Sequence, residues 1–150
     1  MMHEIVNASI GDLAPLAGMF DRYRQFYRQL SDLSGAEKFL RERINKEESV
    51  IYVSRQGTDY TGFVQCYPVF SSVAMKRLWL LNDLFIKENF RGQGISKLLI
   101  DRCKRLAVET AAAGLMLETA KTNAVGNWLY PQEGFVLNKS SNFYFWPNPS

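Results

Sequence analysis

The segment from Ile86 to Leu99 contains the residues with the clearest chemical meaning. It joins an apolar run, typical of a buried strand, to an amphipathic stretch that is typical of a long helix. Gly92 and Gly94 let the backbone turn sharply with its N–H groups pointing outward, and the start of the helix adds positive potential. Such a loop can bind a pyrophosphate, although it can also be a plain turn between a strand and a helix.

Two common glycine loops do not fit this segment. A Walker A loop needs Gly, four residues and then Gly-Lys-Ser/Thr, and the sequence contains no such string. A dinucleotide fingerprint needs a third glycine where the sequence has Lys97. A P-loop is therefore excluded, and a dinucleotide fold is disfavoured.

Predicted strands and helices lie on both sides of this loop in the sequence, which contains no repeats or linkers. Apolar residues recur at helical spacing after Asp12, and Ser34 and Glu37 form a capping-box pair before a second helix. Alternating runs predict strands later in the chain. The predicted strands after the second helix are Val50–Ser54, Tyr60–Val69, Leu78–Ile86, Leu115–Thr119, Phe135–Leu137 and Asn142–Trp146, and the predicted later helices are 94–113 and Asn123–Tyr130.

Composition indicates one compact domain spanning residues 1–150, with 47% hydrophobic and 22% charged residues. The N-terminus lacks the features of a secretory leader and no apolar run is long enough to span a membrane, so we expect a cytoplasmic protein. The net charge of +3 is too small to favour nucleic-acid binding. Cys66 and Cys103 fit reduced core thiols, and one histidine offers little for a metal site.

The string Arg91-Gly92-Gln93-Gly94-Ile95-Ser96 resembles the acyl-CoA signature of the GNAT superfamily of N-acetyltransferases, departing from it only at the small residue Ser96. Leu81–Ile86 and Asn123–Phe135 also resemble family segments, in the family's order. The resemblance implies an α+β fold whose mostly antiparallel mixed sheet has about six to seven strands and about four flanking helices.

The same resemblance implies a function. The protein would transfer an acetyl group from acetyl-CoA to the primary amine of a small molecule or of a basic peptide side chain, by direct attack in a ternary complex without a metal. The alternative is a CoA-binding sensor or structural protein without turnover. Neither a membrane nor a nucleic acid is an expected partner. The aromatic run Phe143–Trp146 could pair at a sheet edge to form a homodimer, and a core strand explains it equally well.

The family pattern assigns roles around the cosubstrate. A backbone N–H near Leu84 would stabilise the thioester oxyanion. Tyr130 would protonate the leaving thiolate, unless it is simply a core aromatic residue. Asn123 and Asn127 would bind the cosubstrate, with a helix cap as the alternative for Asn123. The full set of implied cosubstrate-binding residues is Leu84, Phe85, Ile86, Arg91, Gly92, Gln93, Gly94, Ile95, Ser96, Lys97, Asn123, Asn127 and Tyr130.

The identity of the general base is open. An alkylammonium of pKa ~10.4 is only about 10⁻³ to 10⁻⁴ free amine at pH 7, so a proton acceptor is needed. Similar enzymes often have a carboxylate where this sequence has Asn82, which can only orient water. Asp83 is the nearest carboxylate, but strand alternation predicts that it faces away from Asn82. Asp83 could be a base, an amine anchor or a buried structural residue, and solvent could instead take the proton.

The resemblance places the acceptor between the first two helices and the facing strands. Tyr23, Phe26, Tyr27 and Asp83 are therefore candidates for surrounding a cationic amine. Tyr23 and Tyr27 also fit a core stripe of the first helix, so both interpretations stay open.

Overall fold

The computed structural model describes residues 2–150, which divide into two compact units. The first unit extends to Glu118 and the second comprises Thr119–Ser150. The first unit contains β1 (Glu4–Asn7), α1 (Leu13–Phe26), α2 (Leu33–Asn45), β2 (Val50–Gln56), β3 (Asp59–Ser71), β4 (Lys76–Ile86), α3 (Ile95–Glu109) and β5 (Leu115–Met116), with short 3₁₀ turns at Ile10–Asp12 and Glu88–Phe90. The second unit contains α4 (Ala124–Gln132).

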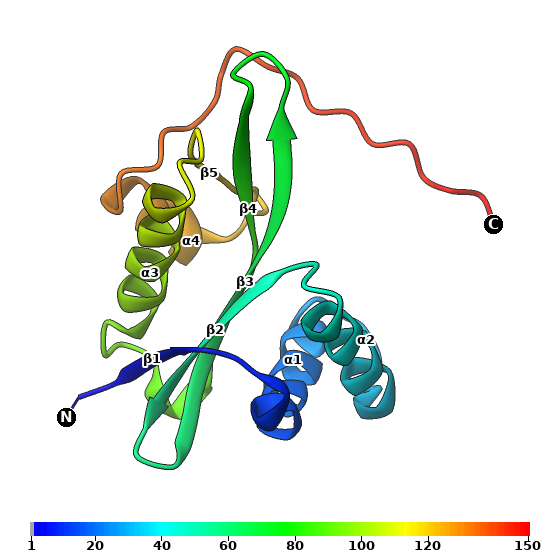
Figure 1. Cartoon of the computed structure of the whole chain (residues 1–150), viewed down its shortest axis with the longest axis vertical. Coiled ribbons are helices and arrows are strands. Elements are labelled where there is room, and N and C mark those ends of the chain that lie inside the picture. Colours follow the sequence, from blue (N-terminus) through cyan, green and yellow to red (C-terminus); the bar gives the residue numbers. More distant parts are fainter. Residues whose placement is uncertain (1) are drawn as a thin grey trace. The chain divides into compact units, whose positions relative to one another are not determined.

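The sheet of the first unit has five strands in the order β1-β2-β3-β4-β5 (Figure 1). Neighbours pair antiparallel from β1 to β4. β5 pairs parallel to β4 at only two positions, Trp79 with Leu115 and Leu80 with Met116. The α+β class, the mixed sheet and the four α-helices are confirmed.

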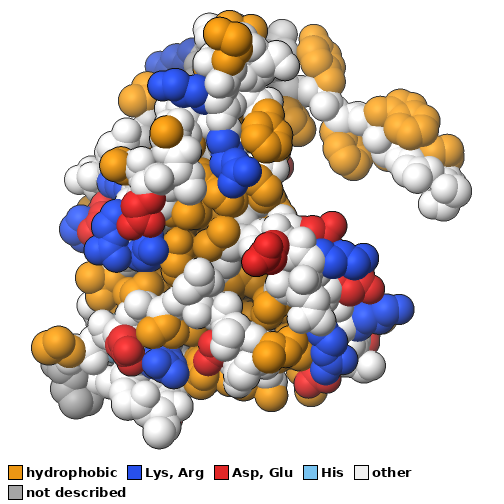
Figure 2. Space-filling view, viewed as in Figure 1, with side chains coloured by type: hydrophobic (Ala, Val, Ile, Leu, Met, Phe, Trp, Pro, Cys, Tyr) orange, Lys and Arg blue, Asp and Glu red, His pale blue; other side chains and the backbone are white. Residues whose placement is uncertain are grey.

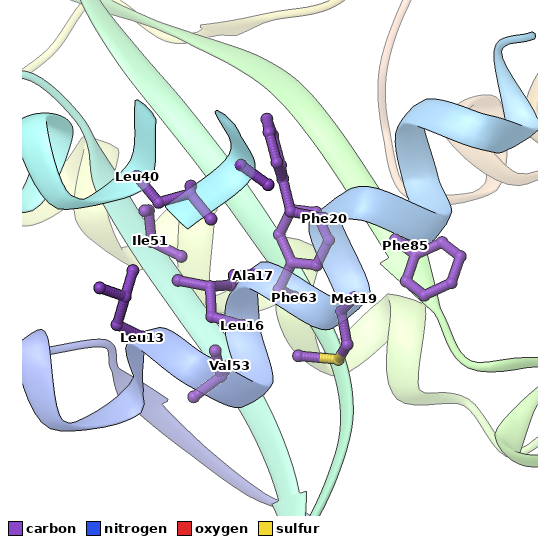
Figure 3. Packing of buried hydrophobic residues seen from close by; sticks show 11 residues of the cluster. Leu13, Leu16, Ala17, Met19, Phe20, Leu40, Ile51, Val53, Phe63 and Phe85 are labelled. Atoms are coloured by element: carbon purple, nitrogen blue, oxygen red, sulfur yellow. The ribbon is translucent and has the colours of Figure 1, made fainter. Parts of the chain in front are cut away.

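Helices cover both faces of this sheet, with α1 and α2 on one face and α3 on the other (Figure 1). The apolar stripe of α1 packs against alternate residues of β2 and β3, including Val53 and Phe63 (Figure 3). The residues that alternate with these in the strands point to the other face, toward α3. One of them is Tyr52, whose ring centre lies 4.5 Å from the Arg102 guanidinium. Because successive side chains of a strand point to opposite faces, one sheet can pack against helices on both sides.

Cys66 of β3 and Cys103 of α3 meet in this second layer, with their Sγ atoms 3.4 Å apart. Both side chains are fully buried and they form no disulfide with each other, which confirms the prediction of reduced core thiols. The hydrogen bond with Cys103 and burial raise the pKa of the Cys66 thiol, so it is kept protonated and unreactive.

The prediction of six to seven strands is wrong, because Phe135–Leu137 and Asn142–Trp146 form no strand. Their aromatic and branched residues favour strands, but this preference reflects packing against neighbouring strands rather than the backbone itself. The predicted strand Leu115–Thr119 is likewise shortened to two residues. The second helix also begins earlier than expected, because the Asp32 carboxylate, rather than Ser34, caps it by accepting the Gly35 N–H at 2.9 Å.

Charged side chains of both signs are mixed over α2 and α3 on the face drawn in Figure 2. Lys97 pairs with Asp101 at 3.2 Å on α3, and Arg43 of α2 pairs with Glu48 at 3.1 Å. In the described part of the chain, no helix is both long enough and apolar enough to cross a membrane.

Candidate active site

A cavity of about 440 Å³ opens in the first unit where α1 and α2 meet β3 and β4. Its lining combines five aromatic residues with polar and small ones. The lining residues are Phe20, Tyr23, Arg24, Tyr27, Gln29, Asp32, Gly35, Ala36, Phe39, Tyr67, Asn82 and Asp83. Tyr23, Tyr27 and Asp83 therefore lie together as the sequence predicts, whereas Phe26 is not part of the lining and is 69% exposed.

Asp83 is the most unusual group of this cavity, because its carboxylate is only 2% exposed. Gln65 Nε2 donates to Oδ2 at 2.5 Å and Asn82 Nδ2 donates to Oδ1 at 2.6 Å. Gln65 is itself oriented by the Ser49 hydroxyl, which donates to its Oε1 at 2.7 Å. Within residues 2–150, no Lys, Arg or His forms an ion pair with Asp83.

Burial raises the pKa of the Asp83 carboxyl above its ordinary value, and the hydrogen bonds from Gln65, Asn82 and Tyr23 only partly oppose this shift. The side-chain amides of Gln65 and Asn82 donate hydrogen bonds to the Asp83 carboxylate, but these neutral groups do not cancel its negative charge. Among the described residues the carboxylate therefore has no positively charged partner in this aromatic pocket, and a bound cation would supply one.

A β-bulge corrects the expectation that Asn82 and Asp83 face opposite sides of the sheet. Gln65 pairs with Asp83 and the next residue of β3, Cys66, pairs with Leu81, so Asn82 is an extra residue without a partner. A bulge interrupts the alternation of side chains. Asn82 and Asp83 consequently line the same cavity, and Tyr23 Oη donates to the Asn82 carbonyl at 3.2 Å.

A second aspartate, Asp21 of α1, stabilises the chain at the rim of the cavity. The Ser31 hydroxyl and the Asp32 backbone N–H each donate to the Asp21 carboxylate at 2.7 Å, which fixes the turn between α1 and α2. These hydrogen bonds lower the pKa of the Asp21 carboxyl, and the charge of Arg24 adds to the effect. Arg24 and Asp32, both lining residues, are thereby placed at the rim.

The edge of β4 beyond Leu80 has no strand beside it in the part of the chain that the structure describes, because its ladder with β5 ends there. On its other edge, residues Leu84, Phe85 and Ile86 pair with Val64, Phe63 and Gly62 of β3. Backbone groups of β4 that point away from β3 therefore have no strand partner among the described residues at this edge. This is the stretch for which the sequence predicts cosubstrate binding.

The loop after β4 has the glycine geometry that the sequence predicts. Gly92 and Gly94 both have φ of 78°, in the left-handed region that disfavours other residues, and α3 starts at Ile95. Arg91 Nε donates to the Ile86 carbonyl at 3.0 Å, so this side chain ties the loop to the end of β4. Gln93 lies in this loop, whereas Ser96 and Lys97 belong to the first turn of α3, where the first backbone N–H groups of a helix have no partner within the helix.

The predicted residues of the second unit form a local structure around α4. Asn123 caps the helix, with Oδ1 accepting the Gly126 N–H at 3.1 Å, as its alternative role predicts. Asn127 Nδ2 donates to the Ala120 carbonyl at 2.9 Å. The Tyr130 ring packs edge-on against Phe135, with centroids 5.8 Å apart. The predicted end of this helix at Tyr130 is wrong, since α4 continues through Pro131 to Gln132.

Sequence reasoning missed most of the cavity lining, including Tyr67 and Phe39, and it missed Gln65, which donates to Asp83. Gln65 is a fully buried amide within a strand of mostly apolar residues, and this contrast was the available signal. No local signal distinguishes Tyr67 or Phe39 from core aromatic residues, because their role depends on which strand and helix meet.

No group of three or more His, Cys, Asp or Glu side chains capable of holding a metal occurs among residues 2–150. Residues 16–135 match the model of the acetyltransferase (GNAT) family, and the chain belongs to this family.

Individual relatives support the same assignment. The chain is 43% identical over 131 residues, covering 87% of its length and 88% of the relative's, to an uncharacterized N-acetyltransferase, YhfO, of Bacillus subtilis strain 168. The chain is also 36% identical to a probable acetyltransferase of known crystal structure, with a TM-score of 0.93. The match covers 98% of this chain and 99% of that one. The fold is also shared with aminoglycoside N-acetyltransferase AAC(6')-Iy in complex with CoA, at 14% identity and a TM-score of 0.82, covering 99% and 96%.

Proposed function

We propose that this protein transfers the acetyl group of acetyl-CoA to a primary amine of a small molecule or basic side chain, by direct attack within a ternary complex. The observation that carries the proposal is the buried carboxylate of Asp83, which has no cationic partner and lies in an aromatic cavity. A protonated amine is the ligand that supplies the missing charge, and the raised pKa makes the carboxylate a stronger proton acceptor than an ordinary aspartate.

Acetyl-CoA fits the other side of the site. The open edge of β4 at Leu84–Ile86 offers backbone groups to the pantetheine amides, and a backbone N–H near Leu84 would stabilise the oxyanion. The loop Arg91–Lys97 offers N–H groups and positive potential to the pyrophosphate. Asn123 and Asn127 are further cosubstrate residues in this proposal, which rests for them on the family pattern.

In this proposal the nitrogen loses two protons. Asp83 accepts the first from the ammonium, directly or through a water that Asn82 orients, and the neutral amine attacks the thioester carbon. As the C–S bond breaks, the leaving thiolate takes a proton from the phenol of Tyr130, and the second proton of the nitrogen leaves through solvent, which restores the phenol. We expect Tyr130→Phe to lower kcat much more than it raises KM for acetyl-CoA, measured from the release of free CoA thiol. An unchanged kcat would remove Tyr130 from the acid role.

Asn82 favours a second candidate, a protein that binds CoA without turnover, because an amide replaces the carboxylate that would act as base. Two measurements separate the candidates. Thermal unfolding with acetyl-CoA, with NADH as an anionic control, tests the cosubstrate site; a ligand at about 100 times its Kd stabilises by ~2.7 kcal/mol. Thiol release with a panel of amines then tests turnover. A shift with acetyl-CoA but no thiol release with any amine would favour the second candidate, and no shift would contradict both.

A further inference from the structure

We infer that the acceptor is a small monoamine with a flat, apolar body, such as an arylalkylamine, rather than a polyamine, an aminoglycoside or a basic protein tail. This inference rests on the proposed function and narrows its acceptor class. It is carried by the charge, the walls and the size of the cavity beside Asp83.

The charged side chains of the cavity favour a ligand with a single positive charge. Its lining contains three residues of the charged types: Arg24, Asp32 and Asp83. Arg24 and Asp32 have opposite signs and lie at the rim, where Arg24 also donates to the Leu30 carbonyl at 3.3 Å and Asp32 caps α2. Asp83 is then the one buried charge without an opposite partner. The charges of Arg24 and Asp32 offset each other, so a second or third ammonium group of the same ligand would gain no net attraction at the rim.

The walls of the cavity are aromatic rings that hold one another in place. Phe20 stacks on Phe39 with centroids 5.7 Å apart and planes within 8°, and Tyr23 meets Tyr27 edge-on at 5.0 Å. Arg43 lies over the Phe39 ring at 4.3 Å and fixes that side chain further. Rings that are already ordered lose little conformational entropy when a ligand binds. A flat apolar body next to the ammonium would bury its surface against these rings.

The volume of the cavity favours a compact acceptor. A volume of about 440 Å³ lies toward the small end of small-molecule sites. A ligand of several sugar rings or an extended peptide would continue past the rim into water, where it would gain no aromatic contact. Recognition therefore favours a compact molecule with one amino group.

The test is a competition between acceptor classes. We would compare 2-phenylethylamine, spermidine, kanamycin and a lysine-containing peptide for acetyl-CoA-dependent thiol release, and measure the binding of each to the protein saturated with CoA. We expect kcat/KM for 2-phenylethylamine to exceed that for each of the others by about tenfold or more, the scale on which apolar pockets discriminate.

A matched pair of variants tests the walls. Tyr27→Leu removes a ring that is 51% exposed and so leaves the core intact; it should raise KM for 2-phenylethylamine by roughly 2- to 30-fold, the range of a cation–π contact. Phe70→Leu makes the same kind of change at an exposed aromatic residue of β3 that does not line the cavity, and should leave KM unchanged. An equal effect of both variants would contradict the assignment of the walls.

The outcomes separate this inference from the proposed function. Higher kcat/KM for spermidine, kanamycin or the peptide overturns the inference and leaves the proposed function standing. If no amine is acetylated, binding decides: tight binding of 2-phenylethylamine alone to the CoA complex supports the acceptor class while contradicting turnover. If 2-phenylethylamine binds no better than the other amines, the inference is overturned.

Discussion

Asp21 and Asp83 are both buried aspartates, 8% and 2% exposed, yet their surroundings act in opposite directions. A hydroxyl and a backbone N–H from the turn after α1 surround the Asp21 carboxylate, and these hydrogen bonds lower its pKa. Asp83 receives amide hydrogen bonds deeper in the protein, and burial raises its pKa.

In the proposed function, the difference separates a structural carboxylate, Asp21, from a catalytic one, Asp83. The charge of Asp21 is used to order the chain around it, whereas the charge of Asp83 is kept without a counterion next to a cavity that a ligand can enter. Carboxyl groups with a pKa raised by desolvation in a cleft are frequent at functional sites. Replacing each aspartate in turn should therefore affect different properties of the protein.

The largest effect is expected from Asp83→Asn on catalysis. Loss of a general base typically lowers the rate by about 10²- to 10⁴-fold, so kcat/KM for the amine should fall on this scale. The loss should be greatest toward low pH, because more of the amine is already neutral at alkaline pH. The measurement is the pH–rate profile of the variant beside that of the wild type. A profile of unchanged shape would exclude Asp83 as the base.

Gln65→Met should sharpen the comparison, because it removes the hydrogen bond from Gln65 to Asp83 together with the bond that Gln65 accepts from Ser49. A hydrogen bond to a charged group contributes about 1.5–3 kcal/mol, so its loss should move the apparent pKa of the acid limb of kcat/KM upward by roughly one to two pH units. The variant should retain binding of acetyl-CoA. A uniform loss of activity at every pH would indicate a packing defect instead of a positioning role for Gln65.

Asp21→Asn should lower the thermal unfolding midpoint by a few degrees at pH 7, because the amide is a weaker acceptor for Ser31 and the Asp32 N–H. The pKa of Asp21 is lower in the folded than in the unfolded protein, so its stabilisation is present above the unfolded pKa of about 3.9 and is lost as pH falls through the folded pKa. The difference from wild type should therefore shrink in acid. Asp59→Asn, at an exposed position, is the control.

The smallest effect is expected from Asp83→Asn on stability, and its sign is opposite. The folded pKa of Asp83 is raised, so the wild type loses stability as pH rises from about 3.9 through the folded pKa. The variant has no such loss, and its unfolding midpoint relative to wild type should increase between pH 4 and pH 7. Buffer scans by thermal unfolding would measure this, and a constant difference would contradict the raised pKa.

Much of the fold was predictable because its signals are local. The spacing of apolar residues locates α1 and α3, and the glycines at 92 and 94 mark the loop between β4 and α3. The segment Asn142–Trp146 shows the limit of such signals, since its aromatic residues predict a strand whose existence depends on a pairing partner.

The site was predictable only in part, for the same reason. Asn82 and Asp83 stand out as polar residues in an apolar strand, and Tyr23 and Tyr27 line the cavity as expected. The relative orientation of Asn82 and Asp83 was not predictable, because the bulge depends on how β3 and β4 pair. Gln65 reaches Asp83 only through that pairing.

The bulge also leaves one position of β4 outside the constraints of the sheet. The ladder continues from Leu81 to Asp83 on either side of Asn82, so residue 82 can change without altering which residues of β3 and β4 face each other. Its side chain nevertheless lies at the cavity. An ancestral or engineered protein could therefore exchange an amide for a carboxylate here, and gain or lose a proton acceptor, while inheriting the same sheet.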